Sequence, residues 1–375
     1  MKLRTLSALF SGMSFVAFTA MASAQTTYLF TSLGSLPTER ESSAAYAINN
    51  FGQVVGTSSP GAVSMYAGQP VQNLGTLGGI FGTAYGINDS GQIVGRANNA
   101  SEQYRPFLTT VGGTMIDLGD LGNKPDAQGF ATGINNSGQI VGQIEAIIGD
   151  VHTVRAFVTT AGGPMQDLGS LNPLGGHSWA AAINNAGQIV GETATLSGAV
   201  AAFLTTAGGT MVNIGDFFPT ALNDYGMVVG WNWQGSQHAA YYTTGNGLLT
   251  DLGSLPGSDF GARALGIGNS GLIVGTAFDS NLSSRAFFTH AGDGILTDLN
   301  DFVVGADGYT LTSANGINDR GQIVGTAFKS IPGWGGVHEA FILTPMAAVP
   351  EPSTWALVMG GVTFGVAMVR RRLRR

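Results

Sequence analysis

The sequence contains no cysteine, and only 10% of its 375 residues are charged. Without cysteine the protein cannot form a disulfide framework, a thiolate nucleophile or a cysteine-ligated metal site. The H-E-x-x-H, P-loop and G-x-S-x-G motifs are also absent. Glycine, with 58 residues, and hydrophobic residues, at 44%, dominate instead. This composition predicts many short buried strands joined by tight turns.

A nine-residue pattern close to Ile-Asn-x-x-Gly-Gln-Ile-Val-Gly recurs seven times. Its first glycine is Gly52, Gly91, Gly138, Gly187, Gly226, Gly271 and Gly321. The intervals of 39 to 50 residues are too long for one turn of a β-helix and match one blade of a β-propeller.

Each repeat can be divided into four strands, here called a to d from the second repeat. Strand a is expected over 83–87, a turn over 88–91, and strand b from 92 onward. Strand c is expected over 105–110 and strand d over 115–119. Apolar neighbours such as Ile93 and Val94 do not alternate with polar residues, so both faces of each sheet should be covered.

The two ends of the repeat region complement each other. A single copy of strand d, Ser32 to Leu36, precedes any a or b strand, and the last repeat ends at Thr344 without a strand d. A ring can use such complementary ends to remove its exposed edges, whereas an open solenoid cannot. The sequence therefore predicts an all-β, seven-bladed propeller over residues 25–345, closed by the N-terminal strand.

The repeats resemble the HAF repeat of bacterial extracellular proteins, through their Ala-Phe, Asp-Leu-Gly and Ile-Asn-x-x-Gly signatures between Leu29 and Thr344. No copy keeps the full His-Ala-Phe. The nearest copies begin at His238 and His338, and arginines occupy the variable position at Arg105, Arg155 and Arg285. The resemblance implies a surface location and no particular activity.

The N-terminus has the features of a secretory signal peptide, residues 1–24. Lys2 and Arg4 precede an apolar run over 6–20, and Ala22-Ser23-Ala24 forms a small-x-small cleavage site. Cleavage between Ala24 and Gln25 would start the exported chain.

The C-terminus has the features of a membrane segment. Residues 353–369 are 17 uncharged residues, about 26 Å as a helix, which is close to the hydrocarbon core of a bilayer. The basic tail 370–375 predicts a cytoplasmic end. Its arginines are Arg370, Arg371, Arg372, Arg374 and Arg375.

A linker over 346–352 carries Val349, Pro350, Glu351 and Pro352 immediately before this segment. The order of Pro-Glu-Pro, apolar segment and arginine cluster resembles the PEP-CTERM sorting signal. The resemblance implies an exosortase as processing partner, anchoring in the inner membrane before cleavage, and then delivery to the cell surface or the biofilm matrix. The alternative is a permanent single-pass anchor.

The exported part is acidic. Removing Lys2, Arg4 and the five terminal arginines leaves 16 − 7 = 9 basic residues against 23 acidic ones, a net charge of −14. This balance argues against binding nucleic acid, or anionic polymers by charge alone.

Loop lengths vary on one face of the predicted ring, where the b–c and d–a connections lie, and a propeller usually binds ligands on such a face. The same connections carry aromatic residues that could stack on sugars or anchor proteins. These candidates are Tyr104, Trp179, Trp231, Trp233 and Trp334. Trp231 and Trp233 could instead extend strand b and pack between blades.

Catalytic and metal sites find little support. The five histidines fall in different repeats, and this spacing neither makes nor excludes a three-histidine metal site, because blades converge on a central channel. No copy of the Asn-Asp or Asn-Asn turn has the alternating ligands of a calcium loop, so turn chemistry suffices for these asparagine and aspartate residues. No cofactor is predicted. The sequence favours a binding or structural module for exopolysaccharide or surface proteins, with a polysaccharide lyase or hydrolase on the same ring as the alternative.

Overall fold

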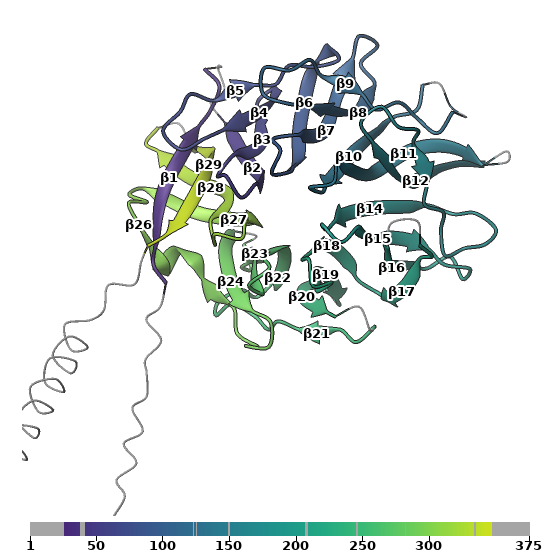
Figure 1. Ribbon diagram of the computed structural model, residues 1–375. Helices are drawn as coiled ribbons and strands as arrows, with labels where there is room; N and C mark the ends of the chain where they lie inside the picture. Colours follow the sequence, from purple (N-terminus) through teal and green to yellow (C-terminus); the bar gives the residue numbers. More distant parts are fainter. Residues whose placement is uncertain are drawn as a thin grey trace, which may run out of the picture. The chain divides into compact units, whose positions relative to one another are not determined.

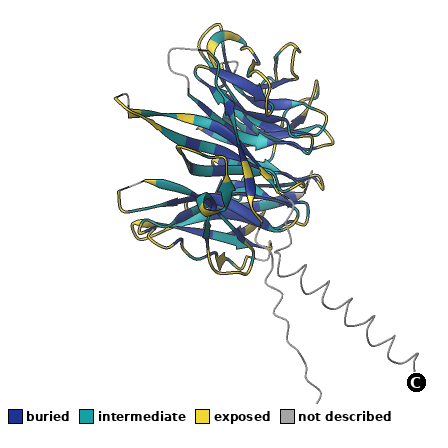
Figure 2. Cartoon of the chain, turned by 90° about the vertical axis from the view of Figure 1, so that its left-hand side faces the viewer, coloured by how far each residue is buried: buried dark blue, intermediate teal, exposed yellow. Residues whose placement is uncertain are grey.

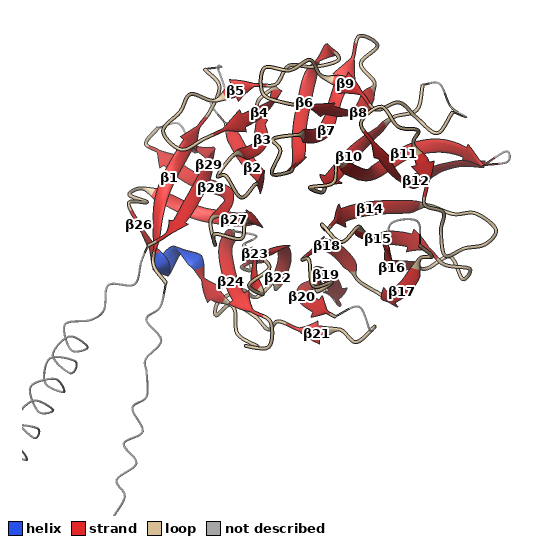
Figure 3. Ribbon diagram, viewed as in Figure 1, coloured by secondary structure: helices blue, strands red, loops and turns tan. Residues whose placement is uncertain are grey.

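The computed structural model describes residues 26–346, except 38–41, 123, 125, 149–150, 207–208, 245–246, 282 and 334. The predicted signal-peptide cleavage site, sorting motif, membrane segment and basic tail lie outside the described residues, as does Trp334. Within the described part, no helix is long and apolar enough to cross a membrane. Its one helix is the short 3-10 helix Leu299–Phe302, visible among the strands in Figure 3.

Six four-stranded antiparallel sheets follow one another along the chain, and each is one blade of a ring (Figure 1). Blade 1 consists of β2 (Ser43–Ile48), β3 (Val54–Ser58), β4 (Gly61–Met65) and β5 (Gln72–Asn73). Blade 2 consists of β6 (Gly78–Ile87), β7 (Ile93–Asn99), β8 (Tyr104–Thr109) and β9 (Ile116–Asp117). Blade 3 consists of β10 (Gly129–Ile134), β11 (Gln139–Ile148), β12 (Val151–Thr160) and β13 (Gln166–Asp167). Blade 4 consists of β14 (Ser178–Ile183), β15 (Gln188–Ala194), β16 (Val200–Thr206) and β17 (Val212–Gly215). Blade 5 consists of β18 (Phe218–Leu222), β19 (Val228–Gln234), β20 (Gln237–Thr243) and β21 (Thr250–Asp251). Blade 6 consists of β22 (Ala262–Ile267), β23 (Leu272–Phe278), β24 (Ser284–His290) and β25 (Thr297–Asp298).

The seventh blade joins the two ends of the chain. It consists of β27 (Tyr309–Ile317), β28 (Ile323–Ile331), β29 (Gly335–Pro345) and β1 (Tyr28–Gly34), with β26 (Val303–Val304) at its outer edge. β1 runs antiparallel to β29, and Tyr28 lies opposite Pro345. The predicted seven-bladed ring closed by the N-terminal strand is confirmed. The outer d strands of blades 1 to 6 are shorter than expected, at two to four residues.

The core lies between neighbouring blades. Ile93 and Val94 are both fully buried, although they are adjacent in one strand. Ile93 packs with Val55 of blade 1, and Val94 packs with Ala131 of blade 3. Both faces of each sheet are therefore covered, as the lack of alternation predicted, and the exposed residues gather in the connections (Figure 2).

A β-bulge in every strand a explains the last glycine of the repeated pattern. The bulge brings a strand a carbonyl over the glycine of strand b. A Cβ on Gly95 would lie 2.0 Å from the Thr83 oxygen and 3.0 Å from the ring of Phe107, which is fully buried. The Val-Gly pair and the Ala-Phe pair thus form one packing unit.

Arginines at the variable position of strand c form ion pairs with strand d of the same blade. Arg105 is buried, and its Nε lies 3.0 Å from Asp117. The equivalent pairs are Arg155 with Asp167 at 3.0 Å and Arg285 with Asp298 at 2.9 Å. The aspartate of the Asp-Leu-Gly signature therefore secures a short outer strand.

Candidate functional site

The seven a–b turns meet at one mouth of the ring and follow a common design. In blade 3, Oδ1 of Asn135 accepts hydrogen bonds from the backbone N–H groups of Ser137 and Gln139, at 3.1 and 2.9 Å. Gly138 takes a φ of 77°, a conformation that favours glycine.

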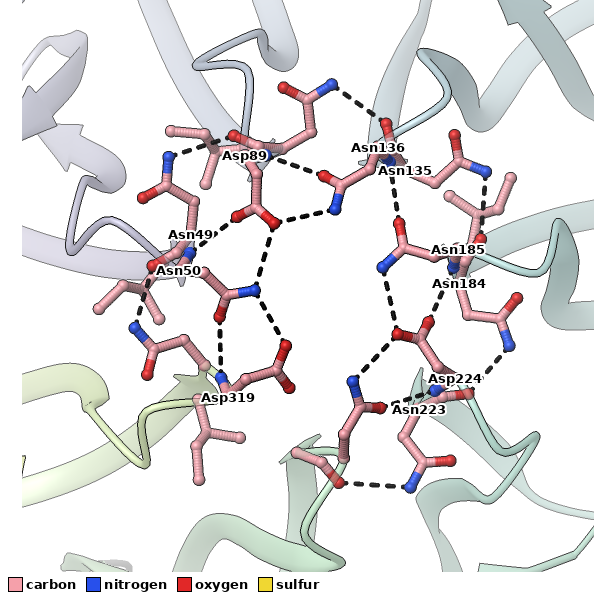
Figure 4. A pocket seen from close by; sticks show the side chains of 18 of the residues that line it. Asn49, Asn50, Asp89, Asn135, Asn136, Asn184, Asn185, Asn223, Asp224 and Asp319 are labelled. Carbon is pink, nitrogen blue, oxygen red and sulfur yellow. Dashed lines mark hydrogen bonds between the residues drawn. The ribbon is translucent and has the colours of Figure 1, made fainter.

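The same asparagine also connects its blade to the next one. Nδ2 of Asn135 donates to the backbone oxygen of Asn184, at 3.1 Å, and to Oε1 of Gln139, at 2.8 Å. The link to the following blade recurs with distances of 2.9 to 3.3 Å (Figure 4). Its donors are Asn49, Asn88, Asn135, Asn184, Asn223 and Asn318. These six residues, with Gly268 at the seventh position, are called the asparagine ring below.

The explanation of these residues by turn chemistry alone was incomplete. A turn cap accepts aspartate or serine as readily as asparagine. The first position is nevertheless asparagine in six of seven copies, and only the amide can donate to the neighbouring blade while its oxygen caps the turn. The recurrence of asparagine in six of seven copies was the signal for an inter-blade role.

The next residue of each turn forms a second ring of hydrogen bonds. The backbone N–H of Asn185 donates to Oδ1 of Asp224 at 2.9 Å, and Nδ2 of Asn185 and Asn269 donate to Oδ2. Burial opposes ionisation of Asp224, but these hydrogen bonds outweigh it and lower the pKa of the carboxyl. Asp89 likewise accepts hydrogen bonds from Asn50 and Asn136.

Together the two rings surround a polar cavity of about 220 Å³ on the axis of the ring, to which every blade contributes three consecutive residues. The carboxylates that face it are largely occupied by protein donors. No group of three or more histidine, aspartate or glutamate side chains in the described ranges could hold a metal ion. The arrangement joins neighbouring blades to one another.

The asparagine ring is interrupted between blades 6 and 7. Gly268 has no side chain to donate to Asn318, and the described residues show no backbone link from Asn269 to Asp319 either. A G-x-G-x-x-G pattern is formed by Gly266, Gly268 and Gly271. These residues lie in the β22–β23 hairpin rather than between a strand and a helix. The pattern therefore lacks the context of a nucleotide-binding loop.

Replacing Gly268 with asparagine is expected to stabilise the protein by about 1 kcal/mol, because the new amide can complete the ring. A Cβ at this position meets its nearest neighbours at 3.6 Å, which is ordinary contact. Urea unfolding of Gly268→Asn and of Gly268→Ala measures the change in stability. Gly268→Ala is the control, because it reduces the freedom of the unfolded chain without supplying an amide. Equal stability of the two variants would contradict the proposed link.

The candidate aromatic residues lie on strands at the opposite mouth. Tyr104 opens β8, Trp179 lies in β14, and Trp231 and Trp233 lie in β19. Strand b continues through Trp231 and Trp233, so their placement in a connection was wrong and the alternative, an extension of strand b, is confirmed. The four described candidates belong to blades 2, 4 and 5 and divide into three clusters.

The largest cluster bridges blades 5 and 6. Trp231 stacks on Phe218, with ring centroids 4.6 Å apart, and the Arg263 guanidinium lies 4.1 Å from the Trp231 ring centroid. The ring centroids of Trp233 and His238 are 4.1 Å apart. Burial, followed by the Arg263 charge, lowers the pKa of His238, so its neutral Nε2 can accept a hydrogen bond from Arg263 at 2.5 Å.

A second cluster belongs to blade 4. Trp179 stacks parallel to His177, with centroids 5.7 Å apart, and lies opposite Glu192 in the strand register. Burial raises the pKa of Glu192 to about 7.

The third cluster surrounds Arg96. Its guanidinium lies 4.5 Å from the centroid of Tyr104 and within 6 Å of the rings of Tyr85 and Phe130. Arg96 and Tyr104 line a cavity of about 440 Å³ where blades 7, 1 and 2 meet. Sequence reasoning did not find Arg96, because its surroundings come from three blades.

The fold is that of a seven-bladed β-propeller, and solved structures share it. Puromycin hydrolase matches with a TM-score of 0.54 and 11% identity, over 81% of this chain and 52% of that chain. Its S511A mutant complexed with PGG matches with a TM-score of 0.52 and 12% identity, over 78% and 51%. The chain thus spans about half the length of these structures, and the likeness concerns the fold alone.

Residues 348–372 match the PEP-CTERM protein-sorting motif. The predicted sorting signal is confirmed, and it implies an exported protein that an exosortase processes and that is sorted to the cell surface. No curated protein matches the chain in sequence. The resemblance to HAF repeats stays a prediction.

Proposed function

We propose that the protein is a binding module of the cell surface or biofilm matrix, whose propeller holds exopolysaccharide at the mouth opposite the asparagine ring. The observation that supports this most directly is the cavity between blades 7, 1 and 2. Its lining combines the aromatic residues Phe81 and Tyr104 with the hydroxyl groups of Thr57, Ser59 and Thr83. Flat rings and hydroxyl groups suit a sugar, which has apolar ring faces and polar edges.

The two mouths of the ring differ in a way that favours this assignment. At the asparagine ring, side-chain donors and acceptors bond to one another across blades. Exposed aromatic rings do not distinguish the mouths, because Phe51 and Tyr225 in the a–b turns are 65% and 81% exposed, against 44% for Phe81 and 50% for Trp233 at the opposite mouth. The difference lies in the polar groups, since the cavity at the opposite mouth is lined by Arg96 and by several serine and threonine hydroxyl groups.

The route to the surface follows from the ends of the chain. Residues 1–24 would direct export, residues 353–369 would hold the protein in the inner membrane, and the arginines of 370–375 would keep its end in the cytoplasm. The exosortase would then cut near Pro350, Glu351 and Pro352 and release the propeller to the surface or the matrix.

Replacing Pro350, Glu351 and Pro352 together with alanine is expected to stop this processing. In the native host, wild-type protein should lose its tail mass and appear at the surface or in the medium, whereas the variant should stay in the membrane fraction at full length. Cell fractionation with mass spectrometry measures both. If wild type and variant both keep the tail in the membrane, the segment is a permanent anchor.

Binding is tested by co-sedimentation of the secreted protein with exopolysaccharide purified from the same host. We expect retention that excess soluble polysaccharide abolishes. Retention on protein-containing matrix, but not on purified polysaccharide, would replace the proposed ligand with a protein partner. Shortening of the polysaccharide during incubation would favour the lyase or hydrolase.

A further inference from the structure

Arg96 carries a positive charge that no side chain balances within the described part of the chain. Arg105, Arg155 and Arg285 each pair with an aspartate, whereas Arg96 forms no ion pair there. Its Nε is buried and has no hydrogen-bond partner. A partly buried guanidinium without an anion is costly, so a ligand that supplies the anion would gain affinity here.

The surroundings of Arg96 hold the charge in place without neutralising it. The ring centroids of Tyr85, Tyr104 and Phe130 lie 4.5 to 5.9 Å from the guanidinium, and these cation–π contacts stabilise its charge. Arg263 in blade 6 is also stacked on aromatic rings, and its Nε is likewise buried without a partner, but its Nη2 bonds to His238. Arg96 differs because it lines an open cavity.

The cavity itself restricts the class of ligand. Its polar lining is mostly hydroxyl groups, together with His338, and none of the described residues that line it carries a carboxylate that would repel an anion. A guanidinium binds a carboxylate through paired N–H donors. Tyr104 and Phe81 offer the faces on which a sugar ring can stack.

We propose that this cavity binds a uronic acid unit of an acidic polysaccharide, with Arg96 on the sugar carboxylate and Tyr104 beside the sugar ring. The inference rests on the proposed polysaccharide binding and adds the charge of the ligand. An acidic peptide would also satisfy Arg96, but the hydroxyl-lined wall favours a ligand rich in hydroxyl groups.

The net charge of the exported part, −14 from 9 basic and 23 acidic residues, disfavours unspecific adsorption of an acidic polymer. Binding must therefore depend on a local site. For the same reason, removal of one arginine at this site should have a larger effect than removal of one elsewhere.

The test measures binding of the secreted protein to oligosaccharides of galacturonate, glucuronate and mannuronate by calorimetry. At least one should bind, and its methyl ester, which lacks the charge, should bind at least tenfold more weakly. Arg96→Gln should weaken binding of the acid at least tenfold. Arg320→Gln is the matched control: Arg320 is exposed in an a–b turn at the other mouth, so affinity should stay within twofold.

Thermal unfolding shows whether Arg96→Gln is folded, and Tyr104→Ser supplies a second variant whose binding should fall if the sugar stacks there. Equal binding of acid and ester, or unchanged affinity in Arg96→Gln, would overturn the inference and leave polysaccharide binding intact. If none of the three acids binds while a neutral polysaccharide does, the uronic acid inference is likewise overturned and polysaccharide binding stands. If no polysaccharide binds at all, the uronic acid inference and the proposed polysaccharide binding are both overturned. Equal binding of poly-glutamate would mean that the site recognises acidic peptides instead.

Discussion

Gly191→Ala is expected to destabilise the propeller by about 3 kcal/mol, because an added methyl group here has no space to move into. Its Cβ would lie 1.9 Å from the backbone oxygen of Trp179 and 2.8 Å from the ring of Phe203. Neither neighbour can yield easily. The oxygen belongs to a bulged strand that is paired on both sides of the bulge, and Phe203 is fully buried between blades.

Urea unfolding followed by far-UV circular dichroism measures this loss. Gly268→Ala is the matched control, because it makes the same chemical change where the nearest atom is 3.6 Å away. The control should remain close to wild type. A loss below 1 kcal/mol for Gly191→Ala would mean that the strand relaxes and that the bulge does not explain the repeated glycine.

Asn135→Ala is expected to cost about 2 to 3 kcal/mol, because it leaves several buried polar groups without partners. Asn135 is 3% exposed, and its amide holds the turn through its oxygen and blade 4 through its nitrogen. The loss should appear as a lower urea midpoint with an unchanged slope.

Asn135→Asp separates the two roles of the side chain. Aspartate keeps an oxygen for the turn but cannot donate to the Asn184 carbonyl, and it places a charge opposite that oxygen. We therefore expect a loss of about 2 kcal/mol, again from unfolding in urea. Stability equal to that of wild type would show that the turn alone requires Asn135.

The repeat, the number of blades and the closing strand could be predicted from the sequence, because each depends on a residue pattern that is visible along the chain. The seven glycines of the a–b turns mark the hairpins, and the unmatched strand at 32–36 identifies its partner. The Arg96 cavity could not be predicted in this way. Its lining runs from Ser42 to His338, and these residues become neighbours only when blade 7 meets blade 1.

The aromatic residues show a different limit. The sequence left two placements open for Trp231 and Trp233, in a connection or in an extension of strand b. Strand b of blade 5 continues to Gln234, which is the second of these placements. The lengths of strands b and c depend on side-chain packing across the hairpin, which the repeated pattern does not record.

The pairing of β1 with β29 also bears on how the protein persists outside the cell. The backbone N–H of Met346 donates to the oxygen of Thr27 at 2.8 Å, so the first and last described segments of the propeller are hydrogen-bonded to each other. Exopeptidases need a frayed end to begin digestion. Trimming from either terminus would stop at this blade, since loosening one end requires the opening of contacts that span the whole chain. The strand pairing that completes the ring thus also protects both ends from degradation.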